Sequence, residues 1–275
     1  MNKYIFHSNA LTNEQLTLIE SLFNQKAEQK DGFYSLQTTE TIELAVLREQ
    51  LNFDVSLLTA DFDGQQIRLL VTDMDSTLIS IECIDEIADM LGIKPQVSAI
   101  TEAAMRGELN FEESLTQRVG LLKGLPVAKL QCVYDERLKL NPGAEKLISY
   151  LQQSNIKLAL VSGGFTFFTE KLKQRLGLDY TLANTLGIED DCLTGKVDGN
   201  IIGAQSKADL LLTLSNDLGL QQHQVIAMGD GANDLLMMDE AGLSVAYHAK
   251  PTVQAKTDIQ LNHSGLDAVV DLLKA

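Results

Sequence analysis

The chain has 275 residues, of which 45% are hydrophobic and 22% are charged, as in an ordinary globular protein. This length allows one sizeable core, or a main domain with a small extra one. The 22 basic and 38 acidic residues give a formal net charge of −16. Such a charge argues against nucleic acid and anionic membranes as partners, because both are bound by clustered Lys and Arg.

The start of the chain and its cysteines bear on where the protein works. No signal peptide is evident at the start, and the most apolar stretch, residues 156–161, is far too short to span a bilayer. The three cysteines, Cys83, Cys132 and Cys192, are widely spaced and form no CxxC motif. We therefore expect a cytoplasmic protein with reduced thiols and neither a disulfide framework nor a zinc site.

The first part of the chain alternates short strand-like and helix-like segments. The expected strands are residues 4–7 and 55–60, and the expected helices are residues 13–27 and 40–50. A polar turn at residues 61–64 closes this part. We interpret residues 1–64 as a small α/β domain of unknown role, and residues 65–275 as the main domain.

Three apolar strands organise the main domain, and each ends in a polar or glycine-rich loop. The strands are expected at residues 67–72, 156–161 and 225–228. Continuous apolar strands separated by helices are typical of a parallel sheet covered on both faces. We therefore expect an α/β fold with a doubly wound parallel sheet, which binds ligands at the carboxyl ends of its strands.

Two insertions elaborate this sheet. Residues 82–140 carry helical patterns and are too long for a simple crossover, so we expect an inserted helical cap there. Residues 180–203 contain spaced glycines among short apolar runs, which indicates a small β-hairpin.

The first polar loop contains the pair Asp73 and Asp75 directly after a buried strand. One carboxylate of such a pair can attack phosphorus and the other can act as a general acid. An isolated Asp-x-Asp is more often a solvated turn, and Asp61 and Asp63, which have the same spacing without matching partners, are interpreted as one.

The other loops supply groups suited to an anion. Ser162 and Gly163 follow the second strand, where a hydroxyl and backbone N–H groups can approach a phosphate. Lys207 precedes a helix expected at residues 208–218, where the helix dipole opposes a positive charge. Beside a phosphate and two carboxylates, this lysine would restrain the nucleophile and balance charge.

The third loop adds Asp230, Asn233 and Asp234. With Asp73 and Asp75 these residues would crowd acidic groups into a small space, which requires a cation. Mg²⁺ is the expected cofactor, because it prefers hard oxygen ligands and leaves room for a phosphate oxygen. The metal and the lysine would then provide the positive field that the whole chain lacks.

In order and type, these loops resemble the four motifs of the haloacid dehalogenase-like superfamily over residues 67–275, and the acid at position 75 resembles its phosphatase branch. This resemblance implies an aspartyl-phosphate on Asp73, and Asp75 as the acid that becomes the base for water. It implies Mg²⁺ held by the Asp73 side chain, the Asp75 backbone carbonyl and the Asp230 side chain. The motif positions also imply phosphate contacts and support, namely Ser162, Gly163, Lys207 and Asn233 for the substrate, with Thr77 and Asp234 in support.

The expected cap resembles that of the phosphoserine phosphatases around Glu82 and along residues 105–119. This resemblance implies that Glu82 binds the substrate ammonium and Arg118 its carboxylate, which agrees with the chemistry of both groups. It also implies that Met105 and Phe111 close over the substrate. The implied reaction is the hydrolysis of O-phospho-L-serine to L-serine and phosphate, the last step of serine biosynthesis, by a monomer or homodimer.

Two alternatives stay open. A related small-metabolite phosphatase or phosphotransferase would keep the chemistry and pass phosphate from Asp73 to another alcohol, such as homoserine. A signalling receiver domain also combines a strand-end aspartate, an acidic cluster and a lysine, but it is much shorter and has no need of an acid at position 75.

Overall fold

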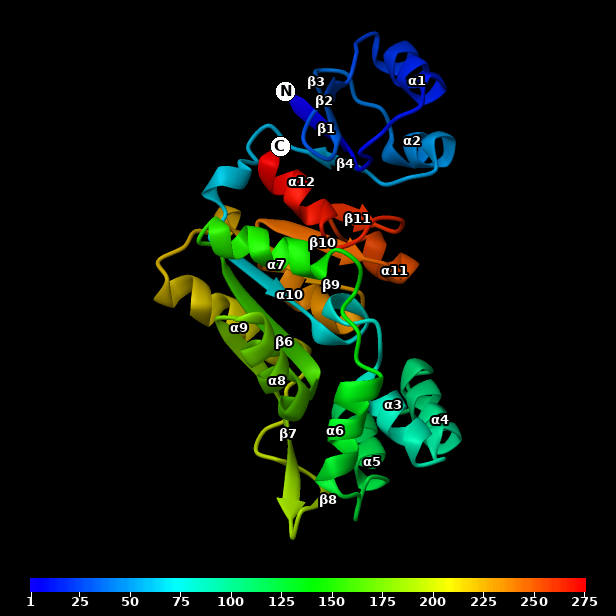
Figure 1. The fold of residues 1–275 in the computed structure, drawn as a ribbon, viewed down its shortest axis with the longest axis vertical. Helices are drawn as coiled ribbons and strands as arrows, with labels where there is room; N and C mark the ends of the chain where they lie inside the picture. The colour runs from blue at the N-terminus through cyan, green and yellow to red at the C-terminus, as the bar shows by residue number, and fades with distance from the viewer.

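The computed structural model describes residues 1–275 and contains a seven-stranded main sheet and a separate four-stranded sheet near the N-terminus (Figure 1). The strands of the main sheet are, in spatial order, β11 (Ile259–Leu261), β10 (Leu243–Tyr247), β9 (Val225–Gly229), β5 (Leu69–Thr72), β6 (Lys157–Phe165), β7 (Tyr180–Glu189) and β8 (Cys192–Asp198). Neighbouring strands run parallel, except that β8 is antiparallel to β7. The parallel sheet and the hairpin within residues 180–203 are therefore confirmed.

Helices cover both faces of the main sheet. One face carries α7 (Ala144–Gln153), α8 (Thr166–Leu176) and α12 (Ala268–Lys274), and the other carries α9 (Ala204–Asp217), α10 (Leu235–Asp239) and α11 (Pro251–Gln254). Successive side chains of a strand point to opposite faces, so Leu70 packs in the first layer while Leu69 and Val71 pack in the second. Burial on both faces explains why this strand is apolar throughout, as a doubly wound fold requires.

The strand register brings the polar loops to one edge. Thr72, the last residue of β5, pairs with Leu160 of β6 and with Met228 of β9. The residues that follow these three positions therefore emerge together at the carboxyl edge of the sheet, where the sequence predicts the ligand site.

Four helices are inserted between β5 and β6, which confirms the helical insertion expected at residues 82–140. They are α3 (Cys83–Met90), α4 (Lys94–Met105), α5 (Phe111–Gly120) and α6 (Val127–Glu136), and we call them the cap. The two connections to the cap lie side by side, because Ile79 forms an isolated bridge with Leu140. Figure 1 shows the cap as a lobe below the sheet, beside the hairpin of β7 and β8.

The N-terminal part contains more strands than the sequence predicts. Its sheet has the order β2 (Glu28–Gln29), β3 (Tyr34–Thr38), β1 (Asn2–Phe6) and β4 (Val55–Leu58), with α1 (Asn13–Phe23) and α2 (Leu44–Leu51) packed against it. The prediction missed β2 and β3. Helix α1 ends before residue 27 because Asn24 adopts a left-handed conformation that caps it.

The contact between this sheet and the main body is both polar and apolar. Asp54 accepts hydrogen bonds from the backbone N–H groups that follow β11, as described below, and the ring nitrogens of His7 lie 2.8 Å from Ser56 Oγ and 3.0 Å from Asp271 Oδ2. Ile5 and Leu58 join the main hydrophobic core. We propose that residues 1–64 form a domain that is held firmly on the main one.

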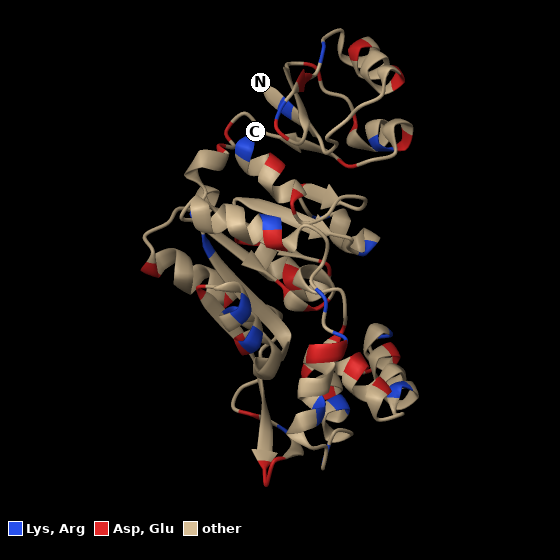
Figure 2. Cartoon of the chain, viewed as in Figure 1, with Lys and Arg blue, Asp and Glu red and all other residues tan.

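Two further features concern the whole chain. No helix is both long enough and apolar enough to cross a bilayer. Acidic and basic residues are interspersed along the N-terminal part, the main domain and the cap, with acidic ones in excess (Figure 2).

Candidate active site

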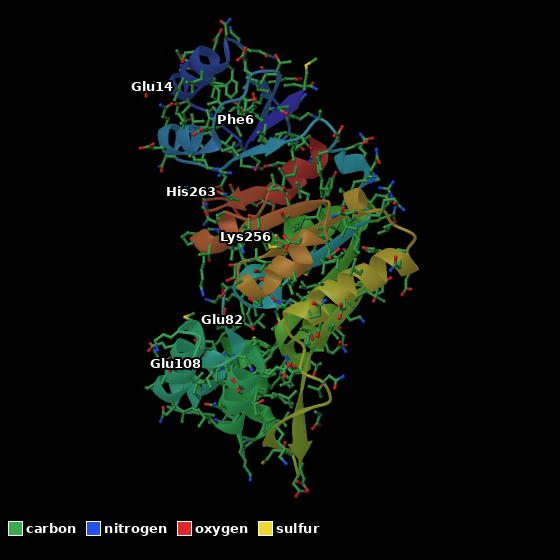
Figure 3. The ribbon with its side chains drawn as sticks, turned by 180° about the vertical axis from the view of Figure 1, so that it is seen from behind. Phe6, Glu14, Glu82, Glu108, Lys256 and His263 are labelled. Atoms are coloured by element: carbon green, nitrogen blue, oxygen red, sulfur yellow. The ribbon has the colours of Figure 1, made fainter.

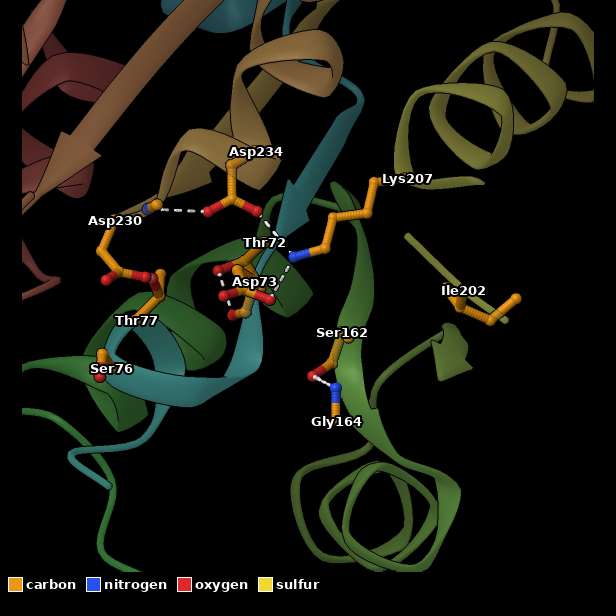
Figure 4. Close-up of polar contacts among 12 residues, drawn as sticks. Thr72, Asp73, Ser76, Thr77, Ser162, Gly164, Ile202, Lys207, Asp230 and Asp234 are labelled. Atoms are coloured by element: carbon orange, nitrogen blue, oxygen red, sulfur yellow. Dashed lines mark hydrogen bonds and ion pairs between the residues drawn. The ribbon is translucent and has the colours of Figure 1, made fainter. Parts of the chain in front are cut away.

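A buried lysine lies between two buried aspartates at the carboxyl edge of the sheet. Lys207 Nζ is 2.6 Å from Asp73 Oδ1 and 2.7 Å from Asp234 Oδ1 (Figure 4). The lysine is 0% exposed and Asp73 only 5%. Helix α9 begins at Ala204, so Lys207 lies in its first turn and not before the helix as predicted. Because two carboxylates surround its ammonium, the unfavourable helix dipole at this position is outweighed.

The cluster has more negative charge than this one lysine can balance. Burial raises the pKa of Asp73 well above its usual range, and Asp234 adds to the rise while Lys207 opposes it. Burial would lower the pKa of Lys207, but the carboxylates of Asp234 and Asp73 raise it overall. Burial and then Asp234 raise the pKa of Asp230 to about 6. A cluster in which carboxylates resist ionisation this strongly favours an additional cation.

The donor set fits a divalent metal site. One carboxylate oxygen from each of Asp73, Asp230 and Asp234 lies within 4.8 Å of the others. Asp234 has both oxygens engaged, since Lys207 donates to one and the backbone N–H of Gly231 donates to the other at 3.0 Å. The second oxygen of Asp73 and the carboxylate of Asp230, to which the Thr77 hydroxyl donates at 3.3 Å, are left to face a metal ion.

Asp75 lies next to the start of the cap. Its Oδ1 accepts the backbone N–H of Cys83 at 3.2 Å. A Cβ atom at Gly164 would lie 2.9 Å from both Asp75 Oδ2 and Ser162 Oγ, so only glycine lets the two side chains sit this close. Burial, followed by the charge of Glu82, raises the pKa of Asp75 to about 7. A carboxyl group with such a pKa exchanges protons readily at neutral pH.

The loop of Ser162 differs from the sequence prediction in one respect. Strand β6 continues to Phe165 instead of ending at residue 161, and α8 begins at Thr166. The glycines therefore belong to the irregular end of a strand and not to a helix N-terminus. Ser162 Oγ accepts the N–H of Gly164 at 2.8 Å, which leaves its own proton available for a ligand.

A cavity of about 520 Å³ opens above these loops and is closed on its other side by the cap. Most of the predicted site residues line it, namely Asp73, Asp75, Glu82, Met105, Phe111, Arg118, Ser162, Gly163, Asp230 and Asn233. The other three, Thr77, Lys207 and Asp234, are buried outside its wall. The structure thus brings together in one place all the residues that were predicted from four separate loops and the cap.

The cap side of the cavity presents two acids, Glu82 and Asp85, and the guanidinium of Arg118. The Ser76 hydroxyl donates to Glu82 Oε1 at 2.6 Å, and Arg118 Nε donates to the backbone oxygen of Ser114 at 3.3 Å. Burial raises the pKa of Glu82, and the hydrogen bond from Ser76 opposes this rise. Met105 is 67% exposed, so its side chain does not yet cover the opening. Acidic and basic groups on one wall can recognise a zwitterionic group.

Sequence reasoning missed several polar residues that belong to the cavity wall or support it, among them Asn184 and Lys250. Asn184, in β7, donates to the backbone oxygen of Gly163 at 2.9 Å and accepts the N–H of Ile202 at 2.8 Å, so it ties the Ser162 loop to the segment before α9. A buried asparagine inside an apolar strand was the only signal for it. Lys250 lines the cavity next to the Asp230 loop, but a lone exposed lysine carries no sequence signal.

The paired aspartates outside the site behave as predicted. Asp63 Oδ1 accepts the N–H of Gln65 at 3.0 Å and begins a short 3₁₀ turn, so the pair at 61 and 63 belongs to a turn.

Comparison with known proteins agrees with this geometry. Residues 67–242 match the family model of the haloacid dehalogenase-like hydrolases. A phosphoserine phosphatase from Polaromonas sp. is 52% identical over 225 residues, which are 80% of this chain and 95% of that protein. The unliganded crystal structure of a probable phosphoserine phosphatase from Vibrio cholerae superposes with a TM-score of 0.86 at 40% identity, over 99% of this chain and 86% of that one.

A further solved structure is a phospho-aspartyl intermediate analogue of a phosphoserine phosphatase. It is 41% identical, with a TM-score of 0.69 over 74% of this chain and 97% of that one. The high identity over most of the chain, together with the family model, shows family membership and not only a shared fold. It belongs to the haloacid dehalogenase-like hydrolases and, among them, to the phosphoserine phosphatases.

Proposed function

We propose that the chain hydrolyses O-phospho-L-serine to L-serine and inorganic phosphate, with Asp73 as the nucleophile, and so serves serine biosynthesis. The observation that carries this proposal is that two pairs of charged residues meet at one cavity. Its base holds Asp73 against Lys207, and its cap wall holds Glu82 and Arg118. A phosphate fits the first pair, and the ammonium and carboxylate of an amino acid fit the second.

In the first step an oxygen of Asp73 attacks phosphorus, and the bond from phosphorus to the serine oxygen breaks. Asp75 donates its proton to that oxygen, so that L-serine leaves as a neutral alcohol. A pKa of about 7 suits Asp75 to this role, because an appreciable fraction of the group is protonated at neutral pH. Lys207 holds the attacking carboxylate in place through its 2.6 Å contact.

In the second step water hydrolyses the aspartyl-phosphate. Asp75, now ionised, takes a proton from the water, whose oxygen forms a bond to phosphorus as the bond to Asp73 breaks. Phosphate leaves, and both carboxyl groups return to their starting states. Ser162 and Asn233 line the same cavity as Asp73, where their side chains can donate hydrogen bonds to the phosphoryl oxygens.

We assign the divalent metal site to Mg²⁺, held by the Asp73 side chain, the backbone carbonyl of Asp75 and the Asp230 side chain. Hard carboxylate and carbonyl oxygens suit this ion. When bound, it neutralises charge on the transferring phosphoryl group. Thr77 and Asp234 support the site, the first through Asp230 and the second through Lys207.

Substrate choice rests on the cap. Glu82 pairs with the ammonium of phosphoserine and Arg118 with its carboxylate, which a guanidinium can bind through two parallel hydrogen bonds. Met105 and Phe111 cover the substrate when bound; the Phe111 ring already lies against Gly163, where a Cβ atom would meet it at 3.0 Å. The free thiols of all three cysteines agree with a reducing cytoplasm as the place of action.

The test is phosphate release from a panel of phosphorylated metabolites, with Mg²⁺ and with a chelator, for the wild type and Arg118→Ala. We expect phosphoserine to be the preferred substrate and the chelator to abolish release. Arg118→Ala should lower kcat/KM for phosphoserine by roughly 100-fold, because a buried charged hydrogen-bond pair is lost, and should change phenyl phosphate hydrolysis little. Equal losses on both substrates would contradict the assignment of Arg118. Phosphate transfer to added homoserine in place of hydrolysis would favour a phosphotransferase.

A further inference from the structure

One cation of the cavity has no role in the mechanism above. Lys250 lies at the N-terminus of α11, directly before Pro251, and its side chain is exposed. Its backbone N–H donates to the backbone oxygen of Asp230 at 3.4 Å. The proline fixes the chain direction at the start of the helix, so the lysine is held beside the loop that carries the metal-binding aspartate.

The charges around the cavity make this lysine unusual. Five carboxylates line the wall, on Asp73, Asp75, Glu82, Asp85 and Asp230, whereas the only cations in the wall are Arg118 and Lys250. Lys207 is buried behind Asp73, and its ammonium is committed to two carboxylates. A phosphate dianion that approaches a chain of net charge −16 therefore meets one exposed ammonium on the phosphatase side of the opening.

The two wall cations come from different parts of the fold. Arg118 comes from α5 in the cap, whereas Lys250 adjoins the loop of Gly231, Ala232 and Asn233, which also lines the wall. Glu82 lies at the boundary between the cap and the main sheet (Figure 3). Both cations oppose the rise in the pKa of Glu82 that burial causes, so Lys250 acts on the charges inside the cavity. Arg118 thus belongs to the cap, whereas the backbone of Lys250 is hydrogen-bonded to the Asp230 loop on the side of the phosphatase loops.

We propose that Lys250 is a phosphate-recognising residue, which captures the phosphoryl group of the entering substrate and also binds the phosphate product. This inference rests on the proposed function, because it assumes that a phosphomonoester enters this cavity. A capture role differs from that of Arg118 in one testable way. Lys250 should act alike on every phosphomonoester, whereas Arg118 should act only on those with an amino-acid carboxylate.

The experiment compares Lys250→Met with Lys256→Met in the full chain. Lys256, labelled in Figure 3, is an exposed lysine just after α11. It does not line the cavity, so its loss removes the same charge elsewhere. We expect Lys250→Met to lower kcat/KM roughly 3- to 10-fold at low salt, the range for an exposed ammonium that meets a dianion. The loss should be equal for phosphoserine and phenyl phosphate, with kcat nearly unchanged.

Three further readouts separate capture from a structural defect. Inhibition by inorganic phosphate should weaken by a similar factor in Lys250→Met, and Lys250→Arg should restore most of both effects. The difference from the wild type should shrink at high ionic strength, because salt screens exposed charges. Lys256→Met should match the wild type throughout.

The outcomes distinguish this inference from the proposed function. If the wild type hydrolyses phosphoserine but Lys250→Met has wild-type KM and phosphate inhibition, the role of Lys250 is refuted while the function stands. A loss confined to phosphoserine would also overturn it, since Lys250 would then contact the amino-acid end. If the wild type itself releases no phosphate from phosphoserine, the proposed function fails first.

Discussion

Replacement of Asp54 by asparagine should destabilise the attachment of the N-terminal sheet. The Asp54 carboxylate is 1% exposed and accepts three backbone N–H groups, from Asn262 at 2.8 Å, His263 at 2.9 Å and Ser264 at 2.7 Å. These donors belong to the loop after β11, so this one side chain makes three hydrogen bonds between the N-terminal part and the main domain. An asparagine keeps one acceptor oxygen, but its NH₂ group would face backbone N–H groups from which it cannot accept a hydrogen bond.

The magnitude follows from these contacts. A hydrogen bond to a charged acceptor contributes about 1.5–3 kcal/mol, and a buried N–H left without a partner costs about 1–3 kcal/mol. With one or two of the three donors left unpaired, we expect Asp54→Asn to lower the free energy of unfolding by roughly 2–4 kcal/mol at pH 7. Other polar contacts between the two parts, those of His7 with Asp271 and of Arg48 with Gln260, should keep the variant folded.

The effect should depend on pH in a defined direction. Burial raises the pKa of Asp54, but the three backbone donors outweigh it, and the folded-state pKa lies below the ordinary value. A group with a depressed folded pKa stabilises the protein above its unfolded pKa of about 3.9, and the stabilisation is lost as pH falls through the folded pKa. The advantage of the wild type over Asp54→Asn should thus be constant near neutrality and shrink below about pH 4.

Urea unfolding followed by circular dichroism at several pH values measures this difference. Asp61→Asn is the matched control, because Asp61 is an exposed turn residue of the same charge, and it should leave stability within about 0.5 kcal/mol of the wild type. An Asp54→Asn variant as stable as this control at pH 7 would refute the reasoning, as would an advantage of the wild type that grows in acid.

Two other perturbations probe the centre of the site. Lys207→Met should abolish phosphate release and lower the free energy of unfolding by roughly 3–5 kcal/mol, because two buried carboxylates lose their counter-ion. Adding Asp234→Asn to this variant should recover part of the lost stability. Strictly additive losses of stability in urea unfolding would count against a buried ion pair. Saturating Mg²⁺ should raise the free energy of unfolding, by about 2.7 kcal/mol at 100 times its Kd. This rise should disappear in Asp230→Asn but persist in Glu82→Gln, whose carboxylate lies outside the metal cluster. A rise that survives Asp230→Asn in thermal or urea unfolding would place the metal elsewhere.

The sheet and its ligand edge could be predicted from sequence because their signals are local. The apolar strand before Asp73 is buried on both faces, and this produces a continuous hydrophobic run that needs no further context. The four loops follow such strands or begin a helix, so their order along the chain already indicated that they meet.

Other features depend on contacts that no local pattern records. Strands β2 and β3 are short and partly polar, and they form because they pair with one another and with β1. Strand β6 continues to Phe165 because its end pairs irregularly with β7. The glycines after Ser162 are typical of a turn, so the sequence predicted that the strand ends earlier. The oligomeric state, monomer or homodimer, stays a prediction.

The supporting residues of the site were hardest to predict for the same reason. Asn184 acts by bridging Gly163 and Ile202, which are 39 residues apart in the sequence (202 − 163). Lys250 belongs to the cavity only because the turn after β10 returns it to the Asp230 loop. Residue type and spacing indicate neither contact, since both arise from the folded arrangement of distant segments.

The central claim, that Asp73 carries the phosphoryl group, is tested most directly by trapping the phosphorylated enzyme. Wild type mixed with radiolabelled phosphoserine and Mg²⁺, quenched in acid within milliseconds and digested, should yield one labelled peptide that contains Asp73. The label should be released by hydroxylamine, as an acyl phosphate is, and should be absent in Asp73→Asn. Label on another residue, or full turnover by Asp73→Asn, would contradict the mechanism.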